Sequence, residues 1–338
     1  MSSGMSAVVN APWIDRQATD LLAQRGHAWL LQGPSGLGQY ELALALVSAW
    51  LCEQPTSHGA CGHCGSCHAI QVRTHADLAV LMPETVMLDL GWPLSEKAQD
   101  EIDKKTRKPS KEIRVDAMRD AVEFAQRTNA RGRGKAVLVF PAERMNTITA
   151  NALLKTLEEP PGDVKFVLAT EASHLLLPTI RSRCLAHTMR WPEANEALQW
   201  LTGQGVPQDV AKALLQSAGG RPTDVLRQAQ AGLSPAWWAA LPKAMLQGDA
   251  RHLADLSPAQ AIDALQKLCH DMVLRHAGAA PRFFEPAQLP ATPASLTLLT
   301  DWFKRLMQSA KTAEHPFNAG LMLEALTADA RQTLQSKS

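Results

Sequence analysis

The chain has 338 residues, 46% of them hydrophobic and 20% charged, and a formal net charge of +1 at pH 7. This length allows two or three domains with substantial cores, and the small net charge argues against a globally basic nucleic-acid binder. No apolar run approaches the ~20 residues of a membrane span and the first dozen residues lack the apolar core of a signal peptide, so we expect a cytoplasmic protein without membrane contact.

Residues 33–40 (GPSGLGQY) have the outline of a phosphate-binding loop, between a predicted buried strand at 28–31 and a predicted helix at 40–50. A strand, a glycine loop and a helix N-terminus in that order form an anion site, because unpaired N–H groups and the helix dipole point at the loop. The consensus G-x-x-x-x-G-K-[ST] requires a lysine for the phosphates and a hydroxyl for magnesium. Here the defining positions hold Gly33, Gly38, Gln39 and Tyr40.

The loop therefore lacks the two side chains that carry its chemistry. Gln39 is neutral, and the phenol oxygen of Tyr40 cannot reach the place of a serine hydroxyl. We expect no ATP to bind here. The alternative is an ordinary glycine-rich turn between a strand and a helix that never had a nucleotide function.

Four of the six cysteines follow in the pattern C-x8-C-x2-C-x2-C, at Cys52, Cys61, Cys64 and Cys67. Two-residue spacers turn successive thiolates toward one centre, and a fourth sulfur completes a tetrahedron, so the pattern predicts a structural zinc site without an open position for catalysis. His58, His63 or His68 lies close enough to replace one cysteine. The other alternative is a set of reduced cysteines without metal.

In the middle of the chain, the pattern of apolar and charged residues predicts a second strand at 77–82, a charged and solvated loop at 95–114 and a helix at 115–128. The predicted apolar face of this helix consists of Val115, Met118, Val122 and Ala125. A basic turn follows with Arg131, Arg133 and Lys135, which could contact phosphate but is more simply a solvated turn.

A third strand at 136–140 ends in Phe140-Pro141, where an ATPase of this type needs an acid pair for magnesium and water. The nearest acid, Glu143, lies three residues beyond the strand. A helix at 150–159, capped by Asn146 or Thr147, precedes further strands at 165–170 and 185–189. Strands that alternate with helices in this way predict a parallel, three-layer α/β domain.

Together these residues resemble the bacterial DNA polymerase III clamp-loader subunits. The resemblance rests on the four cysteines, the strand ending LAT at Thr170, and the stretches Asn151–Pro161 (NALLKTLEEPP), Ser182-Arg183-Cys184 and His315–Thr327 (HPFNAGLMLEALT). It implies an α/β AAA+ module with a parallel five-stranded sheet, a helical lid and a C-terminal all-α collar that joins five subunits in a ring. The active ATPases of this family, tau and gamma, keep the lysine and the acid pair, so this chain resembles a non-hydrolysing member.

The resemblance implies a role for Arg183 as an arginine finger, which enters the ATP site of a neighbouring subunit and stabilises charge on the γ-phosphate. Arg181 is the competing candidate. Family ATPases also carry a sensing arginine in the lid, whereas the matching stretch at 220–226 has Thr223 at that position, with Arg221 two residues earlier. A third nucleotide contact is therefore doubtful.

The implied domains are an AAA+ α/β domain at 1–191 with a zinc-binding insert at 52–67 and the charged loop at 95–114, a lid at 192–232 and a collar at 233–338. Apolar stripes in the collar region predict helix packing; they consist of Ile262, Leu265, Cys269, Met272 and Val273, and of Leu321, Leu323, Leu326 and Leu334. The implied partners are tau/gamma and delta subunits in a pentameric ring and, through the complex, the sliding clamp and primed DNA.

Two other functions compete with this interpretation. The first is an active AAA+ ATPase with an atypical loop that uses Glu143 as its acid. The second is a zinc-dependent module that binds nucleic acid through the cysteine segment, although residues 52–68 contain no Lys or Arg to supply affinity.

Overall fold

The computed structural model describes residues 10–291, 295–313 and 318–336, and the chain divides into two compact units, Met1–Glu193 and Ala194–Ser338. The ends of the first and last predicted domains, at 1–9 and 337–338, lie outside the described residues. So do positions 315–317 of the C-terminal motif. We describe each unit by itself.

The first unit contains a parallel five-stranded sheet in the order β2-β3-β4-β1-β5. Its strands are β1 (Ala28–Gln32), β2 (Leu78–Leu81), β3 (Lys135–Val139), β4 (Val164–Thr170) and β5 (Leu185–Thr188). Strands β1, β3 and β4 are almost wholly buried, which explains why their sequences are continuous apolar runs rather than alternating patterns. The predicted parallel sheet is confirmed.

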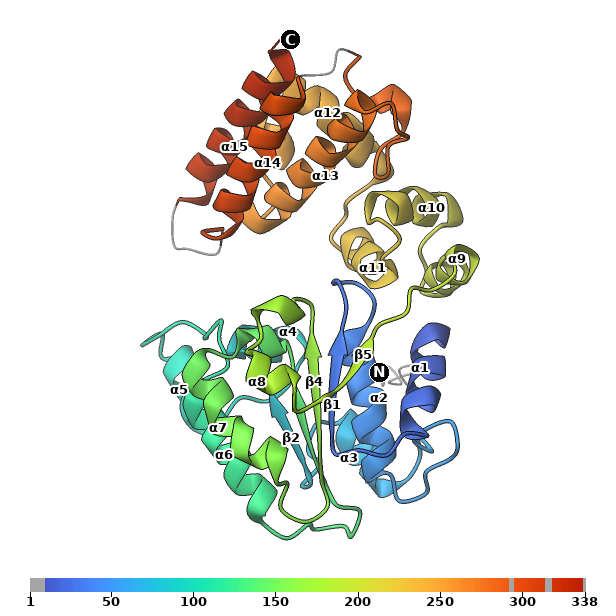
Figure 1. Cartoon of the computed structure of the whole chain (residues 1–338), viewed down its shortest axis with the longest axis vertical. Coiled ribbons are helices and arrows are strands. Elements are labelled where there is room, and N and C mark those ends of the chain that lie inside the picture. Colours follow the sequence, from blue (N-terminus) through green and yellow to red (C-terminus); the bar gives the residue numbers. More distant parts are fainter. Residues whose placement is uncertain (1–9, 292–294, 314–317, 337–338) are drawn as a thin grey trace. The chain divides into compact units, whose positions relative to one another are not determined.

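Helices cover both faces of this sheet and make the expected three layers (Figure 1). On one side α2 (Gln39–Leu51) packs on β1, β3 and β4, with α1 (Pro12–Leu22) and α3 (Gly65–Gln71) against it. On the other side lie α6 (Val115–Gln126) and α7 (Thr147–Glu158), with the short α4 (Glu84–Asp89) and α8 (Pro178–Arg181) nearby. The face that α6 buries carries Met118, Ala121 and Ala125, so Ala121 rather than the predicted Val122 faces the core.

The sequence pattern predicted a loop over the whole of 95–114. This prediction is wrong for part of the segment, because it contains the helix α5 (Glu96–Asp103). The Ser95 hydroxyl caps this helix by accepting from the N–H of Ala98. Beyond the helix, Arg107 donates to the Glu84 carboxylate at 2.8 Å and to Glu101 at 2.6 Å. The dense charges of both signs that suggested a solvated loop therefore pair with each other and fasten the segment to α4.

The described part of the second unit folds into helices that bury two apolar clusters. Helices α9 (Ala194–Gly203), α10 (Gln208–Ser217) and α11 (Pro222–Gln230) form the first. Helices α12 (Pro235–Gln247), α13 (Pro258–His276), α14 (Leu296–Ala310) and α15 (Ala319–Gln335) form the second. The division into a lid at 192–232 and a collar at 233–338 stays a prediction.

The predicted collar stripes are largely confirmed. Ile262, Leu265, Cys269 and Met272 are buried on α13, and Val273 packs partly buried against them. On α15, Leu323, Leu326 and Leu334 are buried, but Leu321 was wrongly included, since it is 64% exposed at the first turn of the helix.

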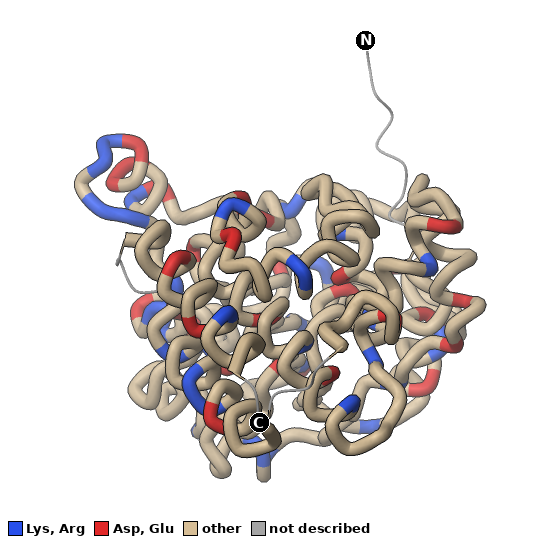
Figure 2. The backbone as a smooth tube through the Cα atoms, turned by 90° about the horizontal axis from the view of Figure 1, so that it is seen from above, with Lys and Arg blue, Asp and Glu red and all other residues tan. Residues whose placement is uncertain are grey.

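Charges of both signs are interspersed along the backbone, as Figure 2 shows, in keeping with the small net charge. Among residues 10–291, 295–313 and 318–336, no helix combines the length and the apolar character that a bilayer crossing requires.

Candidate functional site

The side chain of Gln39 closes the glycine loop of the first unit. Gly38 has the left-handed φ of 93° that ends the loop and caps α2. The next residue, Gln39, is only 2% exposed, and its amide nitrogen donates to the carbonyl oxygens of Gly33 at 2.8 Å and Pro34 at 2.7 Å. The side chain therefore folds back over the loop and binds its carbonyls instead of projecting toward a ligand.

Tyr40 is likewise turned into the protein. Its ring lies 5.5 Å from that of Phe140, and its hydroxyl accepts from the indole N–H of Trp92 at 2.8 Å and from Arg73 at 3.4 Å. The phenol oxygen of Tyr40 thus accepts a buried hydrogen bond from the segment that follows α4. This placement fits the sequence argument that a phenol cannot replace the magnesium-binding hydroxyl.

Two further side chains considered as nucleotide contacts, Glu143 and Arg221, also bind partners within the chain. The carboxylate of Glu143 accepts from the Thr170 hydroxyl at 2.6 Å and from the backbone N–H of Glu171 at 3.1 Å, so it ties the end of β4. In the second unit, Arg221 precedes α11 and lies 3.2 Å from Asp224 of the same helix, while Thr223 lies in its first turn.

The four cysteines at 52, 61, 64 and 67 come together as predicted, with all sulfur atoms within 4.8 Å of one another. The Cys52–Cys64 and Cys52–Cys67 pairs are 3.7 Å apart, and Cys61–Cys67 is 3.9 Å. A tetrahedron with metal–sulfur bonds of about 2.3 Å has edges of about 3.8 Å, so the arrangement fits a single ion with four sulfur ligands. The nearby histidines are not needed to complete it.

Backbone N–H groups point at two sulfur atoms of this cluster, but they lower the pKa of only one thiol: burial raises the pKa of the Cys52 and Cys67 thiols above its ordinary value, whereas the pKa of Cys64 is lowered. The N–H of Cys61 points at the sulfur of Cys52 at 3.3 Å, and the N–H of Cys67 points at that of Cys64 at 3.4 Å. Burial raises the pKa of the Cys64 thiol, but the N–H groups of Cys67 and Glu53 outweigh this effect and bring it down to about 6.

The cysteine segment is tied to the rest of the unit through Glu53, which the sequence argument had overlooked. Its carboxylate accepts from the N–H and the hydroxyl of Ser66, both at 3.2 Å, and from Arg131 at 2.9 Å. One of the basic residues considered for phosphate binding is therefore paired with an acid beside the cysteines. This placement weakens a phosphate role for the turn that begins at Arg131.

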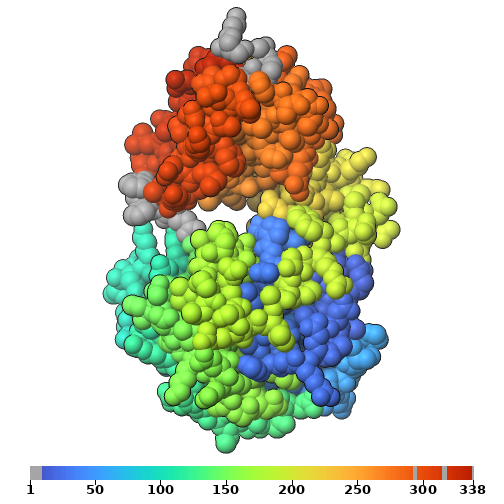
Figure 3. Space-filling model, in the orientation of Figure 1, coloured from blue at the N-terminus to red at the C-terminus, as the bar shows by residue number. Residues whose placement is uncertain are grey.

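Arg183 lies in the turn between α8 and β5, with 29% of its side chain exposed. Its guanidinium donates through Nε to Glu158 at 2.7 Å and also through Nη2 to the same carboxylate oxygen, while Nη1 donates to the carbonyl of Thr179 at 2.8 Å. The segment that carries α7 and α8, green to yellow-green, lies on the surface of the face drawn in Figure 3. Arg183 is thus a surface arginine held by one carboxylate.

The sequence argument missed Glu158 as the partner of Arg183, although one signal was present. Glu158 is the last residue of α7, where the helix dipole disfavours a negative charge, so a nearby cation was to be expected. The sequence alone could not identify this cation as Arg183, because Arg183 lies 25 residues beyond Glu158.

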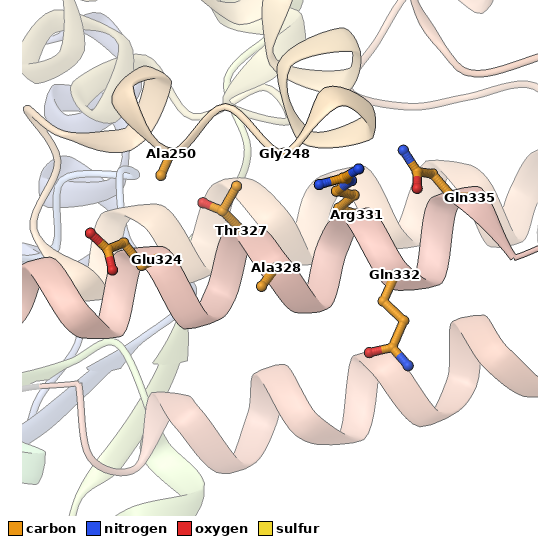
Figure 4. A pocket seen from close by; sticks show the side chains of 8 residues that line it. All are labelled: Gly248, Ala250, Glu324, Thr327, Ala328, Arg331, Gln332 and Gln335. Atoms are coloured by element: carbon orange, nitrogen blue, oxygen red, sulfur yellow. The ribbon is translucent and has the colours of Figure 1, made fainter.

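A hollow of about 490 Å³ in the second unit is a weaker candidate (Figure 4). It lies between the segment Gly248–Ala250 and α15, and its walls are Gly248, Ala250, Glu324, Thr327, Ala328, Arg331, Gln332 and Gln335. Gln335 donates to the carbonyl of Leu246, and Gln332 points away from the segment. This leaves too few converging polar groups to define a ligand, and we assign the hollow no function.

A sequence model of the family described as DNA polymerase III, delta subunit, matches residues 18–192. The chain is 39% identical over 208 residues to DNA polymerase III subunit delta' of Pseudomonas aeruginosa, which covers 61% of this chain and 56% of that protein. It is 36% identical over 217 residues to subunit delta' of Escherichia coli K12, which covers 62% of this chain and 58% of that protein.

The tau subunit of DNA polymerase III from Escherichia coli K12 is 35% identical over 159 residues, 47% of this chain and 21% of that protein. The matched part of the chain therefore spans little more than half the length of the delta' relatives, at 56% and 58%.

Proposed function

The chain belongs to the family described as DNA polymerase III, delta subunit, and from this premise we propose that it is a non-hydrolysing, delta-prime-type subunit of a clamp loader. It supplies Arg183 in trans to the ATP site of a neighbouring tau or gamma subunit. Its parallel five-stranded α/β unit is the AAA+ module of such a subunit. By itself it hydrolyses no ATP and acts as part of a DNA polymerase holoenzyme.

The observation that carries this proposal is the closure of the glycine loop by Gln39. Because its amide already donates to two loop carbonyls, the buried Gln39 side chain offers the β- and γ-phosphates neither the positive charge of the consensus lysine nor a free side-chain donor. A phosphate that entered the loop would have to displace this side chain and leave both carbonyls without partners.

Arg183 can act on a neighbour because it lies at the surface on a fixed turn. The backbone N–H of Arg183 donates to the carbonyl of Ile180, which is fully buried, so the turn is anchored while 29% of the arginine side chain is exposed. A planar guanidinium can donate two parallel bonds to a γ-phosphate and stabilise the charge that develops during transfer.

The four cysteines hold a structural zinc ion in this proposal. The sulfur spacing leaves no coordination position for water or substrate, and a four-sulfur set is typical of sites that stabilise a fold. Because Cys52 directly follows the last residue of α2, the ion fixes the far end of the helix that begins at the closed loop.

The proposed partners are tau or gamma and delta subunits in a pentameric ring, which loads the sliding clamp on primed DNA. The similarity to both delta' and tau proteins supports membership in such an assembly. The competing ATPase function is weakened because Glu143, the acid it needs, is bound to Thr170 and the N–H of Glu171. The competing nucleic-acid module is weakened because Arg131 is paired with Glu53.

The experiment is the Arg183→Ala variant in a clamp loader reconstituted with its tau or gamma and delta subunits. We expect assembly to be unchanged and DNA-stimulated ATP turnover to fall severalfold, because one site loses its transition-state guanidinium. Arg181→Ala, an exposed arginine two residues earlier, is the matched control and should keep full turnover. Unchanged turnover for Arg183→Ala would refute the finger assignment.

A further inference from the structure

We propose that Glu158 is a latch for Arg183: it holds the guanidinium at rest, and a nucleotide phosphate on the neighbouring subunit must displace it. This inference rests on the proposed function and adds the residue that sets how readily the arginine is released. It concerns a positioning residue, since Glu158 acts through Arg183.

The resting contact uses much of the donor capacity of the guanidinium. Arginine has five N–H donors, and two of them point at one oxygen of Glu158 while a third points at the carbonyl of Thr179. The edge formed by Nε and Nη2, which is suited to two parallel bonds, is the edge that the carboxylate occupies. A phosphate that binds this edge must take the place of Glu158.

The position of Glu158 makes the pair exchangeable rather than permanent. Its side chain is 49% exposed and that of Arg183 is 29% exposed, so water can solvate both groups when they separate. Pairs of this exposure contribute little to stability. By contrast, Glu84, which fastens the segment 95–114, is only 9% exposed and accepts from Ser110 as well as from Arg107.

The C-terminal end of α7 also disfavours the negative charge of the Glu158 carboxylate. Glu158 is the last residue of this helix, where the unpaired carbonyls carry partial negative charge. Release of Arg183 would leave that charge uncompensated, and a phosphate beside the released guanidinium would be repelled by the nearby carboxylate. Glu158 therefore opposes early engagement of the arginine, both as a competing acceptor and as a like charge.

The test compares Glu158→Gln with wild type in the reconstituted clamp loader. Glutamine keeps the size of the side chain and removes its charge, so the arginine is released more readily. We expect kcat/KM for ATP to rise about two- to fivefold, the factor that corresponds to an exposed ion pair. Glu159→Gln removes the same charge one residue further on, where the residue is exposed and outside the contact, and should leave kcat/KM unchanged.

The same pair of variants in an Arg183→Ala background separates the latch from a structural effect. The gain from Glu158→Gln should vanish there, because the latch has nothing to release. If Glu158→Gln lowers kcat/KM or leaves it unchanged while Arg183→Ala lowers it, the latch is refuted and the proposed finger stands. If Arg183→Ala has no effect, both are refuted.

A readout without ATP turnover is the NMR signal of the Arg183 Nε–H group in the isolated chain. The bond to Glu158 should shift this signal and slow its exchange with water, and Glu158→Gln should move it toward the position of a free arginine. Glu159→Gln should not move it. An Nε–H signal that is already that of a free arginine in wild type would refute the resting contact.

Discussion

The glycine loop and Arg183 are the two parts of the first unit on which the proposed function depends, and they differ in how their side chains are held. In the loop, Gln39 is 2% exposed and its amide binds two carbonyls of the same turn. Arg183 is 29% exposed and held by one carboxylate and one carbonyl. The first arrangement is part of the core, whereas the second can be exchanged.

The difference indicates what each part can still do. A buried amide with satisfied partners is costly to displace, so the loop acts as a scaffold. A partly exposed ion pair costs little to separate, so the guanidinium of Arg183 can exchange its partner.

Loss of the metal should disturb the loop side of the unit and leave Arg183 in place. We expect the purified chain to contain one zinc ion, and Cys64→Ser to release it and to lower the Tm by more than about 5 °C, because metal affinity contributes directly to folding. Metal analysis and thermal melts measure this, with Cys269→Ser, a cysteine of the second unit, as the control for metal content. Full zinc content in Cys64→Ser would contradict the four-sulfur site.

Restoring the consensus lysine in the loop should destabilise the protein rather than create a site. Gln39→Lys removes two hydrogen bonds and places an ammonium at a position that is 2% exposed, so we expect a loss of about 2–3 kcal/mol. Denaturant unfolding measures the loss. Gln24→Lys makes the same change at an exposed position and should be close to neutral. A neutral or stabilising Gln39→Lys would mean that the loop is open.

The nearly buried carboxylate of Glu84, which is paired with the half-buried Arg107, should make the stability of the first unit depend on pH. Burial raises the pKa of Glu84, but hydrogen bonds from Arg107 and Ser110 outweigh this and hold it below the ordinary 4.5. The stabilisation is therefore complete above about pH 4.5 and is lost as the pH falls toward the lowered value in the folded state.

Glu84→Gln should then cost about 1 kcal/mol at neutral pH. The difference from wild type should shrink as the pH falls from 5 to 3. Unfolding experiments across this pH range provide the measurement. A difference that stays constant with pH would contradict the assigned role of the Glu84 carboxylate.

The sequence predicted the sheet and the cysteine cluster because both depend on local patterns. Apolar runs marked strands β1 to β4, and the spacing of Cys61, Cys64 and Cys67 brought three sulfurs to one centre. What it could not predict were contacts between distant side chains. The pair of Arg183 and Glu158 and the pair of Arg131 and Glu53 depend on which opposite charges the fold brings together. The helix inside 95–114 was missed for a different reason, since its cap, Ser95, is a local signal that the density of charges outweighed in the prediction.

The proposed function requires that the loop of this chain take up no nucleotide. Calorimetric titration of the isolated, zinc-loaded chain with Mg-ATP tests that claim directly. The closed loop predicts no measurable heat of binding up to millimolar ATP, and the same result for Gln39→Ala, which lacks the closing amide but gains no lysine. Binding of ATP by the wild-type chain with micromolar affinity would contradict the account.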